Sequence, residues 1–282
     1  MPNEHSRGRP ALGSRWAQGL LFGVVSVGAA AMFFPFLWTL ITSISSRIGV
    51  SAKPSLIPQD PSLDAYRQLF TELPFGRVVL NSLGIAFIVT VCQVLTSALA
   101  GYAFMRLPFR GRGIIFAAYL ATMMVPGQVL LVPQFVIMKD LGLVDTYPGV
   151  ILPSVASVFG VFLFRQAIDA VPRDLDEAAR LDGAGHFRIF WQVILPLLGP
   201  TTATLSVFAF MGSWNSFLWP LVILRSREMQ TLPLALAGLQ GQYTTHWDLL
   251  MAGSVISIVP MLIIYLFAQK YVVRGVAGAG LK

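Results

Sequence analysis

The sequence is poor in the side chains on which metal sites and most enzyme active sites depend. Its 282 residues include one cysteine, Cys92, and three histidines, His5, His186 and His246. One cysteine excludes a disulfide framework and a zinc-finger cluster, and three scattered histidines argue against a multi-histidine metal site. We therefore expect no metal bound to this chain.

Charged residues are also scarce. Asp, Glu, Lys and Arg make up 12% of the sequence, whereas hydrophobic residues make up 55%. A soluble domain carries roughly 25% charged residues, so this composition excludes a disordered chain, a coiled coil and an ordinary soluble enzyme. The net charge of +7 would fit a nucleic-acid-binding protein only if it formed a basic face.

Six long runs of sequence contain no charged residue, and the shortest of them has 19 residues. The runs are 16–46, 78–105, 113–138, 146–164, 189–224 and 249–269. A helix needs about 20 apolar residues to cross the hydrocarbon core of a bilayer, so each run is long enough for one span. Six buried core helices of a soluble protein would leave too little polar surface for solvation. The sequence therefore predicts an all-α membrane protein with six transmembrane helices.

The fifth run is longer than one span requires. Its first part contains Gln192, Pro196 and Pro200. We interpret this part as an approach along the membrane interface, and we place the span itself at residues 201–222.

Two features of the spans predict how the helices pack. Pro126 and Pro133 are seven residues apart in the third run, on nearly one face of a helix. Proline kinks a helix, and these kinks fit either a cavity or a purely structural role. Small residues in the second run allow another helix to approach closely. These small residues are Ser97, Ala98, Ala100 and Gly101.

The segments between the runs define the expected regions of the chain. The first run begins after Arg15 and is longer than the 7–15-residue core of a signal peptide, so we expect a retained first span. Tyr66, Leu69 and Phe70 lie at helical spacing in the segment that follows, which indicates an ordered cap. The expected regions are a basic tail at 1–15, a first helix at 16–46, an external segment at 47–77, a five-helix core at 78–270 and a C-terminal tail at 271–282.

The distribution of Lys and Arg predicts the orientation. Segments 1–15, 106–112, 165–188 and 270–282 alternate with the other loops and hold 13 of the 20 Lys and Arg residues. By the positive-inside rule, these segments and both termini are expected to face the cytoplasm. The net charge of +7 then lies on the inner face, where it fits contact with anionic lipid and not with nucleic acid.

The predicted spans contain neutral polar residues but no Asp, Glu, Lys, Arg or His. Ion-coupled carriers usually place ionisable residues inside the membrane, so this absence argues against a secondary transporter. It also argues against a membrane enzyme. The neutral polar residues fit two roles, hydrogen bonding between helices or lining a path for an uncharged polar solute. They are Gln93, Ser97, Gln128, Gln134, Ser213, Asn215 and Ser216.

The segment between the fourth and fifth spans carries the most specific pattern in the chain. It reads PRDLDEAARLDGAGHFRIFWQVILPLLGP over residues 172–200. Asp174 followed by Glu177 fits an acidic capping box, and acidic residues favour the N-terminal end of a helix. The pattern therefore predicts a short helix that begins near Leu175.

The same segment predicts a break and a second helical piece. Gly183 and Gly185 should end the first piece, and an amphipathic piece over 186–193 should lead into the membrane. A helical turn lying at the interface is one interpretation. The other is a protruding contact for a partner protein, since the small side chains of Ala178 and Ala179 let another surface come close.

At this segment the sequence resembles a known family. Glu177-Ala178-Ala179, then Gly183, Val193 and Leu195-Pro196, have the spacing of the EAA motif of ABC importer permeases, with valine where isoleucine is usual. Further stretches resemble the carbohydrate-uptake branch of that family, the maltose-permease type. They are GYAFMRLPFRGR (101–112), MMVPGQVLLVP (123–133), LGLVDTYPGVILP (141–153), FRQAIDAVPRDLDEAARLDGA (164–184) and WNSFLWPL (214–221).

The resemblance implies a type I ABC importer transmembrane domain that works in a larger complex. The expected partners are a second homologous permease, two ABC ATPases, an external solute-binding protein and the lipid bilayer. The chain has no glycine-rich phosphate loop, so the ATPase subunits would use ATP and Mg²⁺, and we expect no cofactor on this chain. The implied solute is a disaccharide or oligosaccharide, a polyol or a glycerophosphate ester.

The resemblance also implies roles for particular residues. The EAA loop, 172–196, would be the coupling helix that docks on an ATPase. Its expected contact residues are Leu175, Glu177, Ala178, Ala179, Arg180, Asp182, Gly183, Ala184, Phe187, Leu195 and Pro196. Candidate pathway or gate residues, with aromatic and amide groups suited to a polyol, are Gln93, Gln128, Ser213, Trp214, Asn215 and Phe217. Expected tail contacts with the ATPase are Gly278, Gly280 and Lys282.

Overall fold

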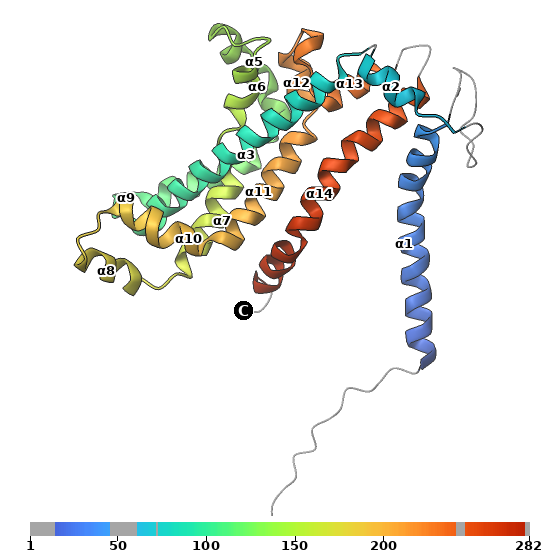
Figure 1. The fold of residues 1–282 in the computed structure, drawn as a ribbon. Helices are drawn as coiled ribbons and strands as arrows, with labels where there is room; N and C mark the ends of the chain where they lie inside the picture. The colour runs from blue at the N-terminus through green and yellow to red at the C-terminus, as the bar shows by residue number, and fades with distance from the viewer. Residues whose placement is uncertain (1–14, 46–60, 72, 241–245, 280–282) are drawn as a thin grey trace, which may run out of the picture.

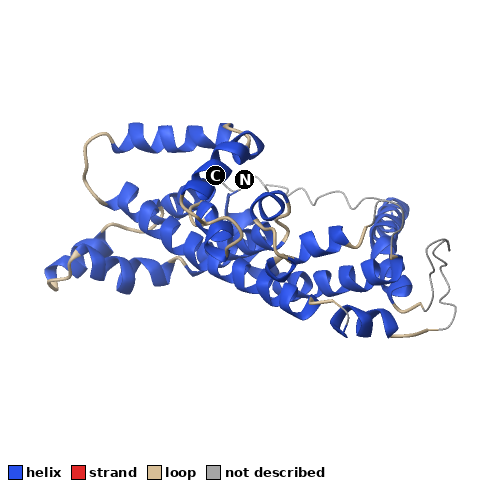
Figure 2. Cartoon of the chain, turned by 90° about the horizontal axis from the view of Figure 1, so that it is seen from above, coloured by secondary structure: helices blue, strands red, loops and turns tan. Residues whose placement is uncertain are grey.

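The computed structural model describes residues 15–45, 61–71, 73–240 and 246–279, and nearly all of this part is helical (Figure 2). The longer elements are α1 (Arg15–Ser43), α2 (Asp64–Thr71), α3 (Phe75–Arg106), α4 (Arg112–Ala121), α5 (Leu131–Asp140), α6 (Tyr147–Ile151), α7 (Val158–Asp169), α8 (Asp174–Leu181), α11 (Gly199–Trp214), α12 (Leu218–Ile223), α13 (Leu232–Gly238) and α14 (Trp247–Ala279). Shorter turns are η1 (Thr122–Met124), η2 (Gly127–Leu130), η3 (Leu152–Ser154), α9 (His186–Ile189), η4 (Phe190–Ile194, a π-helix), α10 (Leu195–Leu197) and η5 (Arg227–Met229).

The helices account for the six predicted spans in two ways. Three helices are long and apolar enough to cross a membrane by themselves, namely α1, α3 and α14. Three further pairs of helices pass the same test together, so the described residues hold up to six spans. The pairs are bent by 93° between Arg112–Met124 and Gly127–Asp140, by 44° between Tyr147–Ser154 and Val158–Asp169, and by 80° between His186–Leu197 and Gly199–Trp214.

The third run bends at Pro126, as the proline predicts, but the bend is a break between two helical segments and not a kink within one helix. The chain breaks sharply at Val125-Pro126, where Val125 is extended with φ −84° and ψ 117°. The residue before a proline is disfavoured in the helical region, which explains the break. Pro133 lies in the first turn of α5, where a missing N–H has no helical partner to lose. The two prolines therefore do not share one helix face.

The fifth run follows the predicted approach and then departs from it. The chain from His186 to Leu197 meets α11 at 80°, as expected of an approach to a span. However, α11 ends at Trp214, and α12 begins only at Leu218. The predicted span over 201–222 is therefore interrupted at residues 215–217. At the other end of the chain, α14 continues through the expected boundary at residue 270 as far as Ala279.

The helices form an elongated bundle with two distinct ends (Figure 1). We call the end that carries α8 and α9 the loop end, and the end that carries α2 and α13 the cap end. Helix α3 lies against α7 and α11 through the middle of the bundle, and α1 contacts α14 at its edge. The first residue of α1 and the last residue of α14 both lie toward the loop end.

Small residues hold α3 and α7 together, as the sequence predicts. A Cβ added to Gly101 of α3 would lie 2.8 Å from the Cβ of Phe164 and 2.9 Å from the backbone nitrogen of Arg165. A Cβ added to Gly160 of α7 would overlap the hydroxyl of Ser97. Close backbone approach through small residues is a common mode of helix packing in membranes. Here it makes α3 and α7 one packed unit.

Candidate functional site

Helix α8 at the loop end begins one residue before the predicted start, and the expected capping box is not formed. Arg173 is the N-cap residue, with helical dihedrals of φ −69° and ψ −23°, and no side chain caps this end. Since the backbone is already helical at Arg173, Asp174 lies inside the first turn and cannot flank it. Asp174, Asp176 and Glu177 nevertheless all lie in the first turn, where negative charge complements the helix dipole.

The predicted break after α8 is confirmed in detail. Gly183 has a φ of +79°, a conformation that glycine adopts without steric cost. Its N–H donates to the carbonyl of Arg180 over 2.9 Å, and the N–H of Ala184 donates to that of Ala179 over 2.9 Å. These two bonds form a Schellman motif. Gly185 is then the N-cap of α9.

The residues expected to contact an ATPase divide into an exposed set and an inward set. Except for Pro196, which lies in α10, the exposed set belongs to the α8–α9 hairpin, which projects from the bundle at the loop end (Figure 1). Its members are Leu175, Glu177, Ala178, Arg180, Asp182, Gly183, Phe187 and Pro196. The inward set, which packs against a buried apolar cluster around Phe164 and Phe190, is Ala179, Ala184 and Leu195.

The exposed set includes large apolar side chains at the tip of the hairpin. Leu181 is 90% exposed and Phe187 is 73% exposed. Leu181 is not among the predicted contact residues, although it lies one turn after Glu177 and so on the same side of the helix. Exposed apolar side chains that gather on a surface outside the charge-free runs indicate an interaction surface.

A buried ion pair anchors α8 to the bundle. Arg106, the last residue of α3, places its Nε 2.7 Å from Oδ2 of Asp176. Nη2 of Arg106 also donates to the backbone carbonyl of Val171 over 2.6 Å. No local sequence pattern predicts this pair, because the partners are seventy residues apart and nothing in the residues around them links them.

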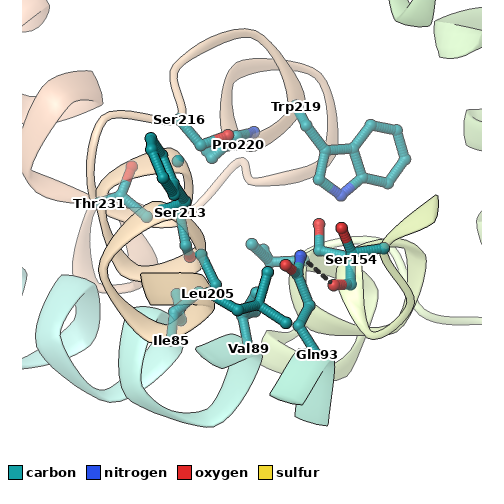
Figure 3. A pocket seen from close by; sticks show the side chains of 15 residues that line it. Ile85, Val89, Gln93, Ser154, Leu205, Ser213, Ser216, Trp219, Pro220 and Thr231 are labelled. Carbon is teal, nitrogen blue, oxygen red and sulfur yellow. Dashed lines mark hydrogen bonds between the residues drawn. The ribbon is translucent and has the colours of Figure 1, made fainter. Parts of the chain in front are cut away.

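A polar cavity lies beside α3, inside the bundle. Its volume is about 300 Å³. Gln93 forms part of its wall and donates from Nε2 to the carbonyl of Ser154 over 2.8 Å, while Trp219 borders it across from Gln93 (Figure 3). The polar residues that line this first cavity are Gln93, Ser154, Ser157, Ser213, Ser216 and Thr231.

A second cavity shares part of the same wall. Its volume is about 540 Å³, and Ser154, Ser216 and Trp219 line both cavities. The break between α11 and α12 brings Asn215 and Phe217 to it, and the break in the third run brings Gln128 to it. The two cavities thus contain five of the six predicted pathway residues. Trp219 was missed as a candidate, although it lies within the quoted stretch WNSFLWPL.

The sixth predicted residue, Trp214, does not line either cavity. Its side chain is 1% exposed within the core cluster at the cap end, and its Nε1 donates to the carbonyl of Ser257 on α14 over 3.2 Å. The prediction of Trp214 as a pathway residue is therefore wrong for the two cavities, because its side chain is packed in the core. Successive side chains on a helix differ in direction by about 100°, so Trp214 faces α14 while Asn215 reaches the cavity.

The linings of the two cavities are uncharged and combine polar with apolar side chains. Their lining residues are serine, threonine, glutamine, asparagine and apolar side chains, with no charged residue among them. The hydroxyl of Thr231 is buried and has no hydrogen-bond partner among the described residues. Within the described ranges, no cluster of His, Cys, Asp and Glu is suited to hold a metal.

The predicted tail contacts are only partly within the structure. Gly278 lies in α14, and Gly280 and Lys282 lie outside the described residues.

The sequence is similar to those of known transport proteins. Residues 93–278 match the family described as "Binding-protein-dependent transport system inner membrane component". The arabinooligosaccharides transport system permease protein AraQ of Bacillus subtilis is 39% identical over 253 residues, covering 88% of this chain and 90% of that protein. The lactose transport system permease protein LacG of Rhizobium radiobacter is 33% identical over 260 residues, covering 92% and 94%.

Solved structures show the same fold. A chain in the crystal structure of a bacterial ABC transporter involved in the import of the acidic polysaccharide alginate superposes with a TM-score of 0.84. The match covers 94% of this chain and 99% of that chain, with 24% sequence identity.

Proposed function

The chain belongs to the family of binding-protein-dependent transport system inner membrane components, and from that premise we propose how it couples to its partners and what it carries. It is a multi-pass permease subunit of the inner membrane and not an enzyme. The proposals concern the coupling surface, the orientation, the partners and the solute.

We propose that the α8–α9 hairpin is the surface that docks on an ABC ATPase. The observation that carries this proposal is the exposed tip of the hairpin, where the apolar side chains of Leu181 and Phe187 are largely exposed and Glu177 lies one turn before Leu181. Apolar side chains around one carboxylate suit a cleft in a partner protein, because burial of the apolar surface stabilises the contact. The carboxylate would then fix the orientation of the contact.

The orientation and the partners follow from this assignment. The loop end, toward which the first residue of α1 and the last residue of α14 lie, would face the cytoplasm, in agreement with the excess of Lys and Arg in the segments on that side. A second permease would complete the membrane part, and an external binding protein would deliver solute to the cap end. Two ATPases would bind ATP and Mg²⁺, since this chain has no phosphate loop.

The mechanism would depend on two arrangements of the spans. ATP binding would close the two ATPases and move the α8–α9 hairpins, which would turn the spans from inward-facing to outward-facing. The binding protein would release solute into the cavity, and hydrolysis would reset the cycle. Each state needs a ligand that prefers it, because a ligand can shift an equilibrium only by its difference in affinity for the two states.

The linings of the two cavities favour a solute that is neutral and rich in hydroxyl groups. Serine, threonine and amide groups exchange hydrogen bonds with sugar hydroxyls, and the flat face of Trp219 suits a sugar ring. A phosphate ester would favour a lining with arginine or lysine, and the described linings contain neither. We therefore propose a disaccharide or oligosaccharide over a glycerophosphate ester.

Substitutions in the hairpin test the coupling proposal. In the purified complex in proteoliposomes, Glu177→Ala should raise the ATP hydrolysed per solute imported by about threefold to tenfold. Gly183→Asn should act in the same direction, because asparagine tolerates a positive φ and adds bulk to the docking face without unfolding the turn. Uptake and ATP hydrolysis are measured in the same vesicles.

The matched control is Asp169→Ala, an exposed acidic residue at the end of α7 on the same side of the bundle. It should leave the ratio unchanged. Wild-type coupling in both Glu177→Ala and Gly183→Asn would overturn the assignment of the docking surface.

A further inference from the structure

We propose that Arg106 and Asp176 form the tie through which movement of α8 reaches the membrane bundle. This positioning role rests on the coupling function proposed above. The Nε of Arg106 lies 2.7 Å from Oδ2 of Asp176, and the two side chains are only 3% and 8% exposed. Within the described residues, this is the one ion pair between side chains.

Few side chains of α8 are buried against the bundle. All eight residues of α8 are described, and Asp176 alone among them is buried. Ala179 is half-buried against the apolar cluster, and the other six are exposed. A helix that projects from the bundle is thus held at its sides by one carboxylate and one methyl group.

Arg106 joins three helical segments with one guanidinium. It ends α3, it contacts Asp176 of α8, and it donates to the carbonyl of Val171 just after α7. One turn earlier on α3, Tyr102 receives the second half of the hairpin. Its hydroxyl lies 3.5 Å from Nδ1 of His186, and its ring lies 5.3 Å from that of Phe190. The last turn of α3 therefore contacts both halves of the hairpin, α8 through Arg106 and α9 through Tyr102.

An ion pair transmits displacement in a way that an apolar contact does not. Apolar packing is non-directional, so α8 could slide across an apolar surface of α3 without moving α3. Separating two buried charges leaves both of them unpaired in a poorly solvated environment, which is strongly unfavourable. The tie therefore resists pulling as well as pushing, and an ATPase that opens and closes must do both.

Helix α3 extends this tie to the cavity and to the cap end. It carries Gln93, which hydrogen bonds to Ser154 in the wall of the first cavity. Near its other end, Asn81 donates to the carbonyls of Glu228 and Gln230 and accepts from the hydroxyl of Tyr147. A helix of 32 residues is roughly 48 Å long at ~1.5 Å per residue. One continuous helix thus connects the hairpin to the first cavity and to the cap end, the two regions that must respond to movement of the hairpin.

Neutral variants of the pair test the proposal in the complete transport complex. Arg106→Gln and Asp176→Asn each leave one buried charge unpaired, and the double variant R106Q/D176N removes both charges together. The double variant should assemble better than either single variant, because it leaves no unpaired charge. It should nevertheless hydrolyse about threefold or more ATP per solute imported than the wild type, since the ionic tie is gone.

Two control variants change exposed charges close to the pair but outside the docking hairpin. Asp169→Asn alters the end of α7, and Arg110→Gln alters the turn after α3. Both should keep the wild-type ratio of ATP hydrolysed to solute imported. A purely structural role for the pair would lower the yield or melting temperature of the complex without moving this ratio. An assembled R106Q/D176N complex with the wild-type ratio would therefore overturn the proposal.

The Glu177→Ala complex separates this proposal from the one on which it rests. If Glu177→Ala uncouples the complex but R106Q/D176N does not, the hairpin docks on the ATPase and the tie is wrong. If neither variant changes the ratio, the docking assignment itself is wrong.

Discussion

At the scale of single residues, Asp145 shows how one side chain holds two loops together by hydrogen bonds. It follows α5 and has a φ of +57°, in the left-handed region that aspartate tolerates better than most residues. Its Oδ1 accepts from the backbone N–H groups of Arg225 and Ser226 over 2.9 and 3.0 Å, and its Oδ2 contacts the hydroxyl of Ser226. Asp145 therefore joins the α5–α6 turn to the segment after α12.

These contacts predict a pH dependence. The hydroxyl of Ser226, followed by the N–H groups of Arg225 and Ser226, lowers the pKa of Asp145. A carboxyl whose pKa is lower in the folded state stabilises the fold fully above its unfolded pKa of about 3.9. That contribution is lost as the pH falls through the folded-state pKa.

Asp145→Asn should therefore lower the melting temperature by a few degrees at pH 7, and the difference from the wild type should shrink below about pH 4. Thermal unfolding of the purified protein, followed at several pH values, measures this. The control is Asp140→Asn, an exposed residue at the end of α5, which should have little effect. A difference for Asp145→Asn that stays constant with pH would contradict the account.

At the scale of elements, the contact between α3 and α7 depends on the absence of side chains. A Cβ on Gly160 would overlap the hydroxyl of Ser97 and lie 2.8 Å from Cδ2 of Leu205 on α11. Three helices therefore meet at this glycine. Because Arg106 ends α3 and donates to Val171, just after α7, a change in the spacing of these two helices would reach the ion pair with Asp176 of α8.

Gly160→Ala should destabilise the bundle by about 1–3 kcal/mol, the usual cost of overpacking. Ser97→Gly should restore part of the stability in the double variant, because it removes the atoms that the new methyl group meets. Gly84→Ala is the matched control, since a Cβ there meets nothing within 4 Å. The measurement is the melting temperature in detergent, and equal effects of Gly160→Ala and Gly84→Ala would contradict this packing.

At the scale of the whole molecule, the proposed solute path exists only because separate breaks in the spans meet. Gln93 comes from α3, Gln128 from the break in the third run and Asn215 from the end of α11. None of these residues is near another in sequence. The path is therefore a property of the assembled bundle and not of any one helix.

Substitutions at this scale separate cavity residues from core residues. Asn215→Ala should raise the solute concentration needed for half-maximal uptake by about threefold to tenfold, the effect of roughly one hydrogen bond. Trp214→Phe should lower stability, because it loses the bond to Ser257, but it should leave that concentration unchanged. Uptake of labelled oligosaccharide into proteoliposomes gives both values. The opposite pattern would exclude Asn215 from the path.

The sequence by itself predicted the features that depend on local composition. Charge-free runs of sufficient length predicted an all-α membrane protein with up to six spans. Small residues from Ser97 to Gly101 predicted a close helix contact, and Gly183 predicted the end of α8. The EAA spacing identified the family that the comparison then matched. Each of these signals lies within a few dozen residues of chain, so no tertiary information is needed to detect it.

Only the tertiary structure decided which of those residues face one another. Trp214 and Asn215 are neighbours in the sequence and were equivalent as candidate pathway residues. Packing against α14 placed Trp214 in the core. The break at Pro126 replaced a kinked helix by two segments at 93°. Asp176 lies within a run of charged residues and is identified as an anchor only by Arg106, seventy residues away. Long-range contacts depend on how the whole chain packs, so local sequence patterns do not contain them.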